Sequence, residues 1–323
     1  MKRVLICCTS RNHLRFLIPL IEELTRRAYV LLYCNVSEIK QDSYHYKLVE
    51  MVQSNPNLRV TDLSDQQSFA DFYRHTNSLL VTTGSDSQWH QKEFYLTENA
   101  KCKTFAIQHG MSQDGITRHP ARHFSADHVL TWVKPGQITE SAALDKDKFI
   151  SVGVPNHYYE KVKKFEGSKV FLFTSFFDLS NEQDIKLETS KGEWSGIYTK
   201  KWKEETWDKI DELCDNDDIC FFVRHPCCEK KPLHPTFQKI LERPNKVVLD
   251  TRYFQEHGVS RSMVYSLGSK YYVTYPSSCW LDCYLNGVDY EVFVDYNSNV
   301  DILLEDSLQG INKTAEICEL LLQ

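Results

Sequence analysis

Short hydrophobic runs, separated by polar and often helical segments, recur along the whole chain. Residues 4–8 form a strand-like run, residues 14–27 carry apolar side chains at helical spacing, and residues 30–34 form a second strand-like run. A strand, a helix and a strand in close succession predict the βαβ unit of a parallel sheet. The pattern continues with strand-like runs at residues 58–60, 79–82, 104–107, 128–132 and 148–152.

A second series of strand-like runs begins after a charged connector at residues 160–168. Its first long helix is expected at residues 198–213, and its strands are expected at residues 170–174, 219–223, 247–249, 270–274 and 291–294. Two such series predict an α/β protein with two Rossmann-like, doubly wound domains that face each other across a cleft. We expect domains at residues 1–165 and 166–323, with a last helix that could return to the first domain.

The composition is that of a soluble globular protein with room for two domains. The chain has 323 residues, of which 41% are hydrophobic and 25% are charged. A net charge of −6 argues against nucleic-acid binding as its main role. Polar residues from Thr9 onward break the first apolar run too early for a secretion signal, and the sequence lacks an apolar stretch long enough to span a membrane. We therefore expect a cytoplasmic protein without a transmembrane segment.

Eleven cysteines are a high number for such a chain. Because the number is odd and no secretion signal precedes them, they are expected to be reduced, buried thiols. The nearest approach to a zinc site lacks the usual C-x-x-C spacing, and it consists of Cys214, Cys220, Cys227, Cys228 and His234. The sequence therefore predicts neither a bound metal nor a cofactor.

A histidine follows the predicted strand at residues 104–107. The sequence Gln108-His109-Gly110 can hold the His109 ring in a sharp turn at the end of that strand. An imidazole that titrates near neutral pH is suited to take a proton from an attacking hydroxyl. Asp114 could orient this histidine or act as the base itself. The alternative is a structural role, in which His109 caps a helix in the turn.

A second basic motif, Arg224-His225-Pro226, ends the predicted strand at residues 219–223. Proline fixes the backbone after the histidine, so the strand stops and the ring is presented at its tip. Arg224 and His225 together could bind a pyrophosphate through charge-assisted hydrogen bonds. The alternative is an arginine in a surface ion pair and a histidine in the core. His234-Pro235 repeats the dipeptide without a preceding strand and is predicted to be a loop.

Paired hydroxyls follow the predicted strand at residues 270–274. The sequence Tyr275-Pro276-Ser277-Ser278 lies between this strand and a segment with helical spacing that ends in Asn286-Gly287. Two hydroxyl groups and several unpaired backbone N–H groups at a helix N-terminus attract phosphate. A serine pair after a strand is common, so the prediction depends on its combination with the other motifs.

The order of these motifs resembles that of the GT-B glycosyltransferases. An Arg11-Asn12-His13 turn before a helix is similar to the opening of these enzymes. The order of the later motifs is similar to that of the CDP-glycerol glycerophosphotransferase-like group, the capsule Kdo transferases and the bacterial sialyltransferases. Those motifs are Gln108-His109-Gly110, Gly153-Val154-Pro155-Asn156, Arg224-His225-Pro226 and Tyr275-Pro276-Ser277-Ser278 with Leu281-Asp282. The resemblance covers most of the chain, but each motif is short.

The resemblance implies roles for individual residues. The histidine before glycine activates the acceptor in those families, which falls on His109. The His-Pro histidine and the serine pair bind the donor phosphate, which falls on His225, Ser277 and Ser278, with Arg224 and Asp282 beside them. The acceptor side of the cleft then holds Arg11, Asn12, His13 and Gln108. The first domain would bind the acceptor and the second the donor.

Two departures from the polyol-phosphate transferases favour a sugar-nucleotide donor. Those enzymes tend to have an aromatic residue before His-Gly and Asp-Tyr before Ser-Ser, whereas this chain has Gln108 and Tyr275-Pro276. The sequence thus predicts a metal-independent glycosyltransferase with a nucleotide-sugar donor and a carbohydrate acceptor. The alternatives are a polyol-phosphate transferase or a sugar-nucleotide epimerase of the same fold. A non-catalytic nucleotide-sugar-binding protein is an alternative of another class.

Overall fold

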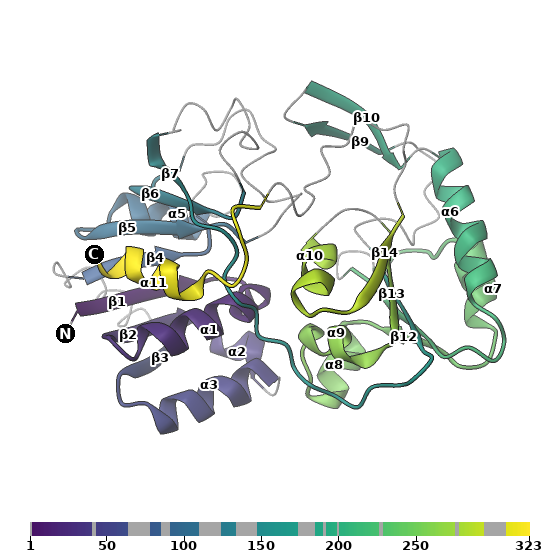
Figure 1. The fold of residues 1–323 in the computed structure, drawn as a ribbon, viewed down its shortest axis with the longest axis horizontal. Coiled ribbons are helices and arrows are strands. Elements are labelled where there is room, and N and C mark those ends of the chain that lie inside the picture. Colours follow the sequence, from purple (N-terminus) through teal and green to yellow (C-terminus); the bar gives the residue numbers. More distant parts are fainter. Residues whose placement is uncertain are drawn as a thin grey trace. The chain divides into compact units, whose positions relative to one another are not determined.

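The computed structural model divides the chain into two compact units. Unit 1 comprises residues 1–158 and 303–323, and unit 2 comprises residues 159–302. The structure describes residues 2–40, 43–63, 78–84, 91–109, 124–133, 147–173, 185–189, 192–198, 200–225, 229–274, 278–293 and 308–323. Each unit is built around its own parallel sheet (Figure 1). The predicted α/β class with two Rossmann-like domains is therefore confirmed.

Unit 1 contains a seven-stranded sheet with the order β3-β2-β1-β4-β5-β6-β7. Its strands are β1 (Lys2–Cys8), β2 (Ala28–Cys34), β3 (Leu58–Asp62), β4 (Ser78–Thr82), β5 (Lys103–Ile107), β6 (His128–Thr131) and β7 (Phe149–Ser151). Every neighbouring pair is parallel, and β1 lies between β2 and β4. This is the strand order of a doubly wound sheet, and each of these strands overlaps a run predicted from the sequence.

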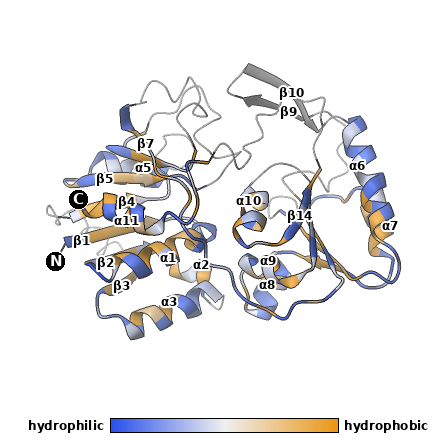
Figure 2. Cartoon of the chain, viewed as in Figure 1, coloured by the Kyte–Doolittle hydropathy of each residue, from blue (hydrophilic) through white to orange (hydrophobic). Residues whose placement is uncertain are grey.

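The described residues of unit 1 include six helical segments, five between its strands and one after them. They are η1 (Arg11–His13), α1 (Leu14–Leu24), α2 (Val36–Ile39), α3 (Ser43–Ser54), α5 (Gln91–Glu98) and α11 (Thr314–Leu322). Seven of the eleven residues of α1 are buried, and all seven are hydrophobic, in agreement with the mostly hydrophobic colouring of this helix in Figure 2. Such a helix is stabilised by packing against the sheet rather than by helix propensity alone.

The last helix of the chain returns to unit 1. Helix α11 packs against α1, and the Cys318 thiol lies 3.7 Å from the carbonyl oxygen of Leu20. Arg27 and Glu319 form an ion pair between the two helix ends. Figure 1 shows α11, in yellow, beside the first strands and α1 of the same unit. Helix α11 therefore packs beside α1 in the helical layer of unit 1.

A proline in α1 helps to attach the segment that leaves unit 1. Pro19 has no N–H group, so the carbonyl of Arg15 receives no hydrogen bond from the helix position four residues later. The backbone N–H of Tyr158 donates to this Arg15 oxygen instead, at 2.6 Å. A residue that would weaken a helix therefore provides an acceptor for the outgoing chain.

A glycine makes possible the close contact between the outgoing segment and the returning one. Gly153 has a φ of +83°, and a Cβ atom placed on it would lie 2.7 Å from the carbonyl oxygen of Gly310. The neighbouring Val154 N–H donates to that same oxygen at 2.9 Å, and the Lys313 N–H donates to the Val154 oxygen at 2.8 Å. A side chain at position 153 would separate these two backbones.

The first residues after position 158 belong to unit 2. The Ser260 N–H donates to Glu160 Oε2 at 3.1 Å, and the Phe165 N–H donates to the Leu267 oxygen at 2.8 Å. The sequence placed the boundary between residues 165 and 166, whereas the contacts place it between Tyr158 and Tyr159. The charged connector misled the prediction because its backbone and side chains bind to unit 2.

Unit 2 contains a five-stranded parallel sheet with the order β12-β11-β8-β13-β14. Its strands are β8 (Lys169–Leu172), β11 (Cys220–Val223), β12 (Lys246–Leu249), β13 (Lys270–Val273) and β14 (Asp289–Val292). Its helices are α6 (Lys200–Leu213), α7 (Pro235–Leu241), α8 (Thr251–His257), η5 (Arg261–Met263), α9 (Val264–Leu267) and α10 (Ser278–Leu285). The five strands and α6 agree with the sequence prediction.

Two features of unit 2 differ from the prediction. An antiparallel hairpin of β9 (Ile185–Thr189) and β10 (Gly192–Tyr198) precedes α6, so residue 198 ends a strand instead of starting the helix. His234, predicted in a loop, is the N-cap of α7, and its Nδ1 accepts a hydrogen bond from the Thr236 N–H. A proline at the first helical position has the φ that a helix needs, so His234-Pro235 starts a helix here.

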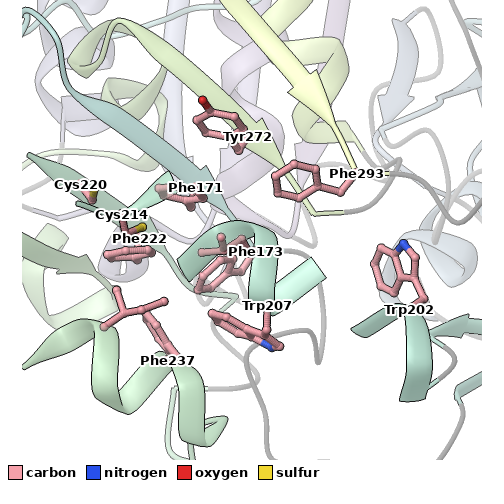
Figure 3. Close-up of a cluster of buried hydrophobic side chains, with 12 residues drawn as sticks. Phe171, Phe173, Trp202, Trp207, Cys214, Cys220, Phe222, Phe237, Tyr272 and Phe293 are labelled. Carbon is pink, nitrogen blue, oxygen red and sulfur yellow. The ribbon is translucent and has the colours of Figure 1, made fainter. Parts of the chain in front are cut away.

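Aromatic side chains form the core of unit 2 (Figure 3). Phe171 on β8 lies opposite Phe222 on β11 and Tyr272 on β13 in the strand register. Its ring is stacked on both, with centroids 5.1 Å and 5.0 Å apart respectively. Phe293 extends this row beyond Tyr272 at 5.7 Å. The in-register row ties the three central strands together, because cross-strand aromatic pairs stabilise neighbouring strands.

Candidate functional site

The order in which the strands of unit 1 are added to the sheet reverses between β1 and β4. From β1 the chain proceeds to β2 and β3 on one side of the sheet, and β4 to β7 lie on the other side. In doubly wound sheets, ligands bind beyond the carboxyl ends of the strands at such a switch point. η1 follows β1, and Thr83 follows β4, so both lie at this position.

Two histidine rings meet beyond these strand ends. His13 at the end of η1 and His109 after β5 have ring centroids 4.3 Å apart, with planes inclined by 32°. Both are held by Thr83, since His13 Nδ1 lies 2.8 Å from the Thr83 hydroxyl and His109 Nδ1 lies 2.6 Å from the Thr83 carbonyl oxygen. His109 is buried and His13 is half-buried. One threonine therefore fixes the orientation of both imidazoles.

A buried carboxylate lies behind the two histidines. Glu93 on α5 has no exposed surface. Its Oε1 accepts hydrogen bonds from the Thr9 N–H at 3.2 Å, the Thr9 hydroxyl at 2.7 Å and the Thr83 hydroxyl at 3.1 Å. Burying a carboxylate is costly unless it is hydrogen-bonded, and these donors offset that cost. Burial, reinforced by the Glu93 carboxylate, raises the pKa of the Cys7 and Cys8 thiols well above their usual value.

The directions of these hydrogen bonds define the tautomers of both histidines. A carbonyl oxygen can only accept, so His109 must donate its Nδ1–H to Thr83. The Thr83 hydroxyl donates to Glu93, so it must accept from the Nδ1–H of His13. In each neutral ring the lone pair then resides on Nε2. Such a nitrogen can take a proton from a hydroxyl group.

The remaining candidates of unit 1 differ in their environments. Arg11 is half-buried and Asn12 is exposed, and both lie on η1 beside His13. Gln108 is buried, its side-chain Oε1 accepts from the Trp132 N–H at 2.7 Å, and its own N–H donates to the Leu130 oxygen at 2.9 Å. Gln108 thus links the ends of β5 and β6 beside His109. Its predicted contact with the acceptor stays a prediction.

The corresponding position in unit 2 lies at the carboxyl ends of β11, β8 and β13. The last residues of these strands are in register, with Leu172 paired to both Val223 and Val273. Arg224 and His225 come directly after β11, and α10 begins at Ser278 shortly after β13. The strand order reverses between β8 and β13, so these residues follow strands at or beside the switch point of unit 2.

Arg224 is buried and braced by its own loop. Its Nη1 donates to the carbonyl oxygen of Glu229 at 3.1 Å, and its backbone oxygen accepts from Arg261 Nη1 at 2.8 Å. Arg261 also forms a 3.0 Å ion pair with Glu229, and that carboxylate accepts from the N–H and hydroxyl of Thr251. The turn that carries His225 is therefore fixed to the N-terminus of α8 and to η5.

Asp282 lies inside unit 2. It has no exposed surface, and its Oδ1 accepts a hydrogen bond from the Tyr159 hydroxyl at 3.2 Å. This contact joins α10 to the first residue of unit 2. The donor-binding role assigned to Asp282 from the resemblance stays a prediction, and the geometry adds a structural role to it.

Several expectations from the sequence concern residues or features that the structure describes only partly. Asp114, Ser277 and Pro226 lie outside the described residues. Among the residues that the structure describes, no group of three His, Cys, Asp or Glu side chains could hold a metal ion. The cysteines in that part of the chain are free thiols, and most are buried. The helices described here include none that is long and apolar enough to cross a bilayer.

Known proteins resemble the chain in fold only. No protein-family profile matches it, and no curated protein sequence matches it. Solved structures that resemble it include the glycotransferase of kitacinnamycin, with 13% identity, a TM-score of 0.46, and coverage of 91% of this chain and 81% of that one. HepE of Anabaena, solved with UDP, has 11% identity and a TM-score of 0.45, with 99% and 89% covered. A UDP-glucosyltransferase from Polygonum tinctorium that can glucosylate indoxyl, solved with 3,4-dichloroaniline, has 13% identity and a TM-score of 0.44, with 98% and 88% covered.

Sequence reasoning missed four residues that organise the two sites. Thr83 and Glu93 hold the histidines of unit 1, and Glu229 and Arg261 hold the Arg224 turn of unit 2. Thr83 directly follows a predicted strand, so its position was a usable signal. Glu93 lies on a helical segment with other charged residues, and Arg261 lies in a short helical turn, and in neither place does the sequence distinguish a buried charge from a solvated one.

Proposed function

We propose that the chain is a glycosyltransferase that moves a sugar from a nucleotide-sugar donor to a carbohydrate hydroxyl. The observation that carries the proposal is a matched pair of switch points. One sheet holds imidazoles beyond its strand ends, and the other holds an arginine, a histidine and a helix N-terminus. Deprotonating a hydroxyl and stabilising a departing phosphate are the two tasks of glycosyl transfer from a nucleotide.

Unit 2 binds the donor in this proposal. Its His225 and Ser278, with the backbone N–H groups at the start of α10, hydrogen-bond to the phosphate of the nucleotide. Arg224 holds the turn and adds positive charge beside it. As the bond between the sugar and the phosphate breaks, negative charge grows on the leaving nucleotide, and these groups stabilise it.

Unit 1 binds the acceptor. The hydroxyl that attacks the sugar loses its proton to an imidazole Nε2 of the pair formed by His13 and His109. The new bond joins the acceptor oxygen to the sugar, and the nucleotide leaves with the electron pair of the broken bond. Asp114, which also follows β5 in the sequence, is the alternative proton acceptor.

A donor screen tests the proposal. Thermal unfolding is followed with UDP, GDP, CMP and CDP, because a ligand that binds only the folded chain stabilises it by RT ln(1 + [L]/Kd). The sugar nucleotides of the stabilising base are then assayed for release of free nucleotide with a panel of glycan acceptors. Release that requires an acceptor supports the transferase. Stabilisation without turnover of any donor indicates a binding protein instead.

The same assay separates the related activities. Release of CMP from CDP-glycerol or a similar polyol donor identifies a polyol-phosphate transferase. Interconversion of the sugar without release of nucleotide identifies an epimerase. Turnover in excess EDTA supports a metal-independent reaction, whereas loss that Mg²⁺ or Mn²⁺ restores contradicts it.

A further inference from the structure

We propose that Glu93 and Thr83 are positioning residues that select His13, rather than His109, as the proton acceptor. The proposal rests on the proposed transferase function and names the residues behind its base. The feature that carries it is the chain of hydrogen bonds from Glu93 Oε1 through the Thr83 hydroxyl to His13 Nδ1, with distances of 3.1 Å and 2.8 Å.

The direction of this chain follows from its first acceptor. In this relay Glu93 is ionised, so its Oε1, which also accepts the backbone N–H of Thr9, has no proton to donate to Thr83. The Thr83 hydroxyl can then only donate to it. Since that hydroxyl has a single hydrogen, its contact with His13 must be an accepted bond from Nδ1–H. His13 Nε2 therefore keeps the lone pair.

Thr83 contacts the two histidines through different groups. His109 donates to the backbone carbonyl of Thr83, which is a neutral dipole. His13 donates to the side-chain hydroxyl, which passes the interaction on to a buried carboxylate. When a ring accepts a proton, the negative charge of Glu93 stabilises the imidazolium at His13 through this chain. Two rings 4.3 Å apart cannot both be charged at low cost, so His13 takes the proton first.

Other titratable groups surround this pair. Within the described part of the chain, the groups that face His13 include His109 after β5 and, through Thr83, Glu93 on α5. His157, from the segment after β7, faces it across Phe16, whose ring lies 6.0 Å from each of these two histidines. Cys7 and Cys8 on β1 are kept neutral by burial, and Arg11 and Arg15 lie on the elements of His13 itself. Lys92, beside Glu93 on α5, is exposed.

The nitrogen-15 NMR spectrum of labelled histidine tests the relay without any substrate. The two neutral tautomers of imidazole give different Nδ1 and Nε2 shifts, and assignment uses His13→Gln and His109→Gln samples. In the wild-type chain both rings should be in the Nδ1–H form. In Thr83→Val the hydroxyl is lost but the carbonyl remains, so His13 should become a mixture of tautomers while His109 stays unchanged. His109 is therefore an internal control.

Two further variants separate the hydroxyl from general effects. Thr82→Val removes a neighbouring buried hydroxyl on β4 whose 3.4 Å contact is with the Phe105 oxygen, and it should leave both tautomers unchanged. Thr83→Ser keeps the hydroxyl and should retain the Nδ1–H form of His13. If Thr83→Val does not fold, Thr83→Ala and Thr83→Ser make the same comparison.

Glu93→Gln isolates the charge from the geometry. The amide oxygen can still accept from Thr83, so His13 should keep its tautomer, but it should release its proton at lower pH than in the wild type. In a transferase assay the acid limb of kcat/KM should move to lower pH in the same direction, with the nucleotide Kd unchanged. A loss of stability alone would not shift this limb.

The outcomes distinguish the relay from the proposed function. An unchanged His13 tautomer in Thr83→Val, or an unchanged His13 titration in Glu93→Gln, overturns the relay even if the chain transfers sugars. The expected NMR changes in a chain that turns over no donor support the relay geometry and reject the transferase. The acid limb moving with Glu93→Gln, together with both NMR changes, supports the two proposals jointly.

Discussion

The two sheets of the molecule place opposite chemistry at equivalent positions. Both have the strand order of a doubly wound sheet, and in both the candidate residues follow strands near the switch point. In unit 1 these residues form a pair of imidazoles backed by a buried carboxylate, whereas in unit 2 they supply an arginine, a histidine and a helix N-terminus. The fold therefore determines where a site lies, and the residues after each strand determine which charge it favours.

The largest effect should come from removing the proposed proton acceptor of unit 1. His13→Ala should lower kcat by roughly 10²–10⁴-fold, the usual contribution of general-base catalysis, while the nucleotide Kd stays the same. Steady-state kinetics and nucleotide titration measure the two quantities. His257→Ala, which removes an exposed histidine of unit 2, is the control and should leave kcat unchanged. If the nucleotide Kd rises as much as kcat falls, the division of labour between the units is wrong.

Removing phosphate contacts from unit 2 should have the opposite pattern. His225→Ala or Ser278→Ala should each weaken nucleotide binding by roughly 1.5–3 kcal/mol, or about 10–150-fold in Kd. Isothermal titration with the nucleotide identified by the donor screen measures this loss. Ser269→Ala is the matched control, because that serine precedes β13 and lies at the amino end of the strand, opposite to the candidate phosphate site. Wild-type affinity in both site variants would remove unit 2 as the donor site.

The two units should also differ in how well they tolerate alanine in place of a glycine that has a positive φ. Gly153 in unit 1 and Gly167 in unit 2 have φ of +83° and +73°, but a Cβ atom meets the Gly310 backbone only at Gly153. Gly167→Ala should cost about 1–2 kcal/mol of backbone strain. Gly153→Ala should cost about 1–3 kcal/mol more, because it overpacks the contact. Chemical denaturation measures both, and equal losses would contradict the close approach.

The smallest effect should be a pH dependence of unit 2 that comes from a structural histidine. His234 stacks on Trp207 with centroids 5.0 Å apart, and burial lowers its pKa. The unfolded chain then binds more protons, so the free energy of unfolding should fall as pH decreases below the ordinary histidine pKa. His234→Asn can still cap α7 and should reduce this slope. Urea denaturation between neutral and mildly acidic pH measures it, and an identical slope in the variant would show that His234 is not responsible.

The sequence predicted the sheets better than the sites. Each parallel strand overlaps an apolar run, because a strand buried on both faces must be continuously hydrophobic. The hairpin of β9 and β10 was missed, since residues 185–198 lack a continuous apolar run and end next to a helical pattern. His109, Arg224 and His225 were singled out because each lies within two residues of the end of a predicted strand, and the structure places each of them just beyond β5 or β11.

The supporting residues could not be found in this way. Glu93 and Arg261 become important only when the fold brings them to strand ends far away in the sequence, beside Thr9 and Arg224 respectively. A periodic pattern indicates which face of a helical segment is apolar, but it does not indicate which charge is buried. Three-dimensional proximity, not residue type, distinguishes them.

The return of α11 to α1 has a consequence for biosynthesis. A ribosome makes β1 and α1 first and the helix that covers α1 last, with all of unit 2 made in between. Domains generally fold as units while the chain emerges. Unit 2 can thus reach its native state before α11 is made. Until then, the face of α1 that packs against α11 stays uncovered. Nascent chains halted before residue 314 should therefore expose this face to chaperones, whereas chains that include α11 should not.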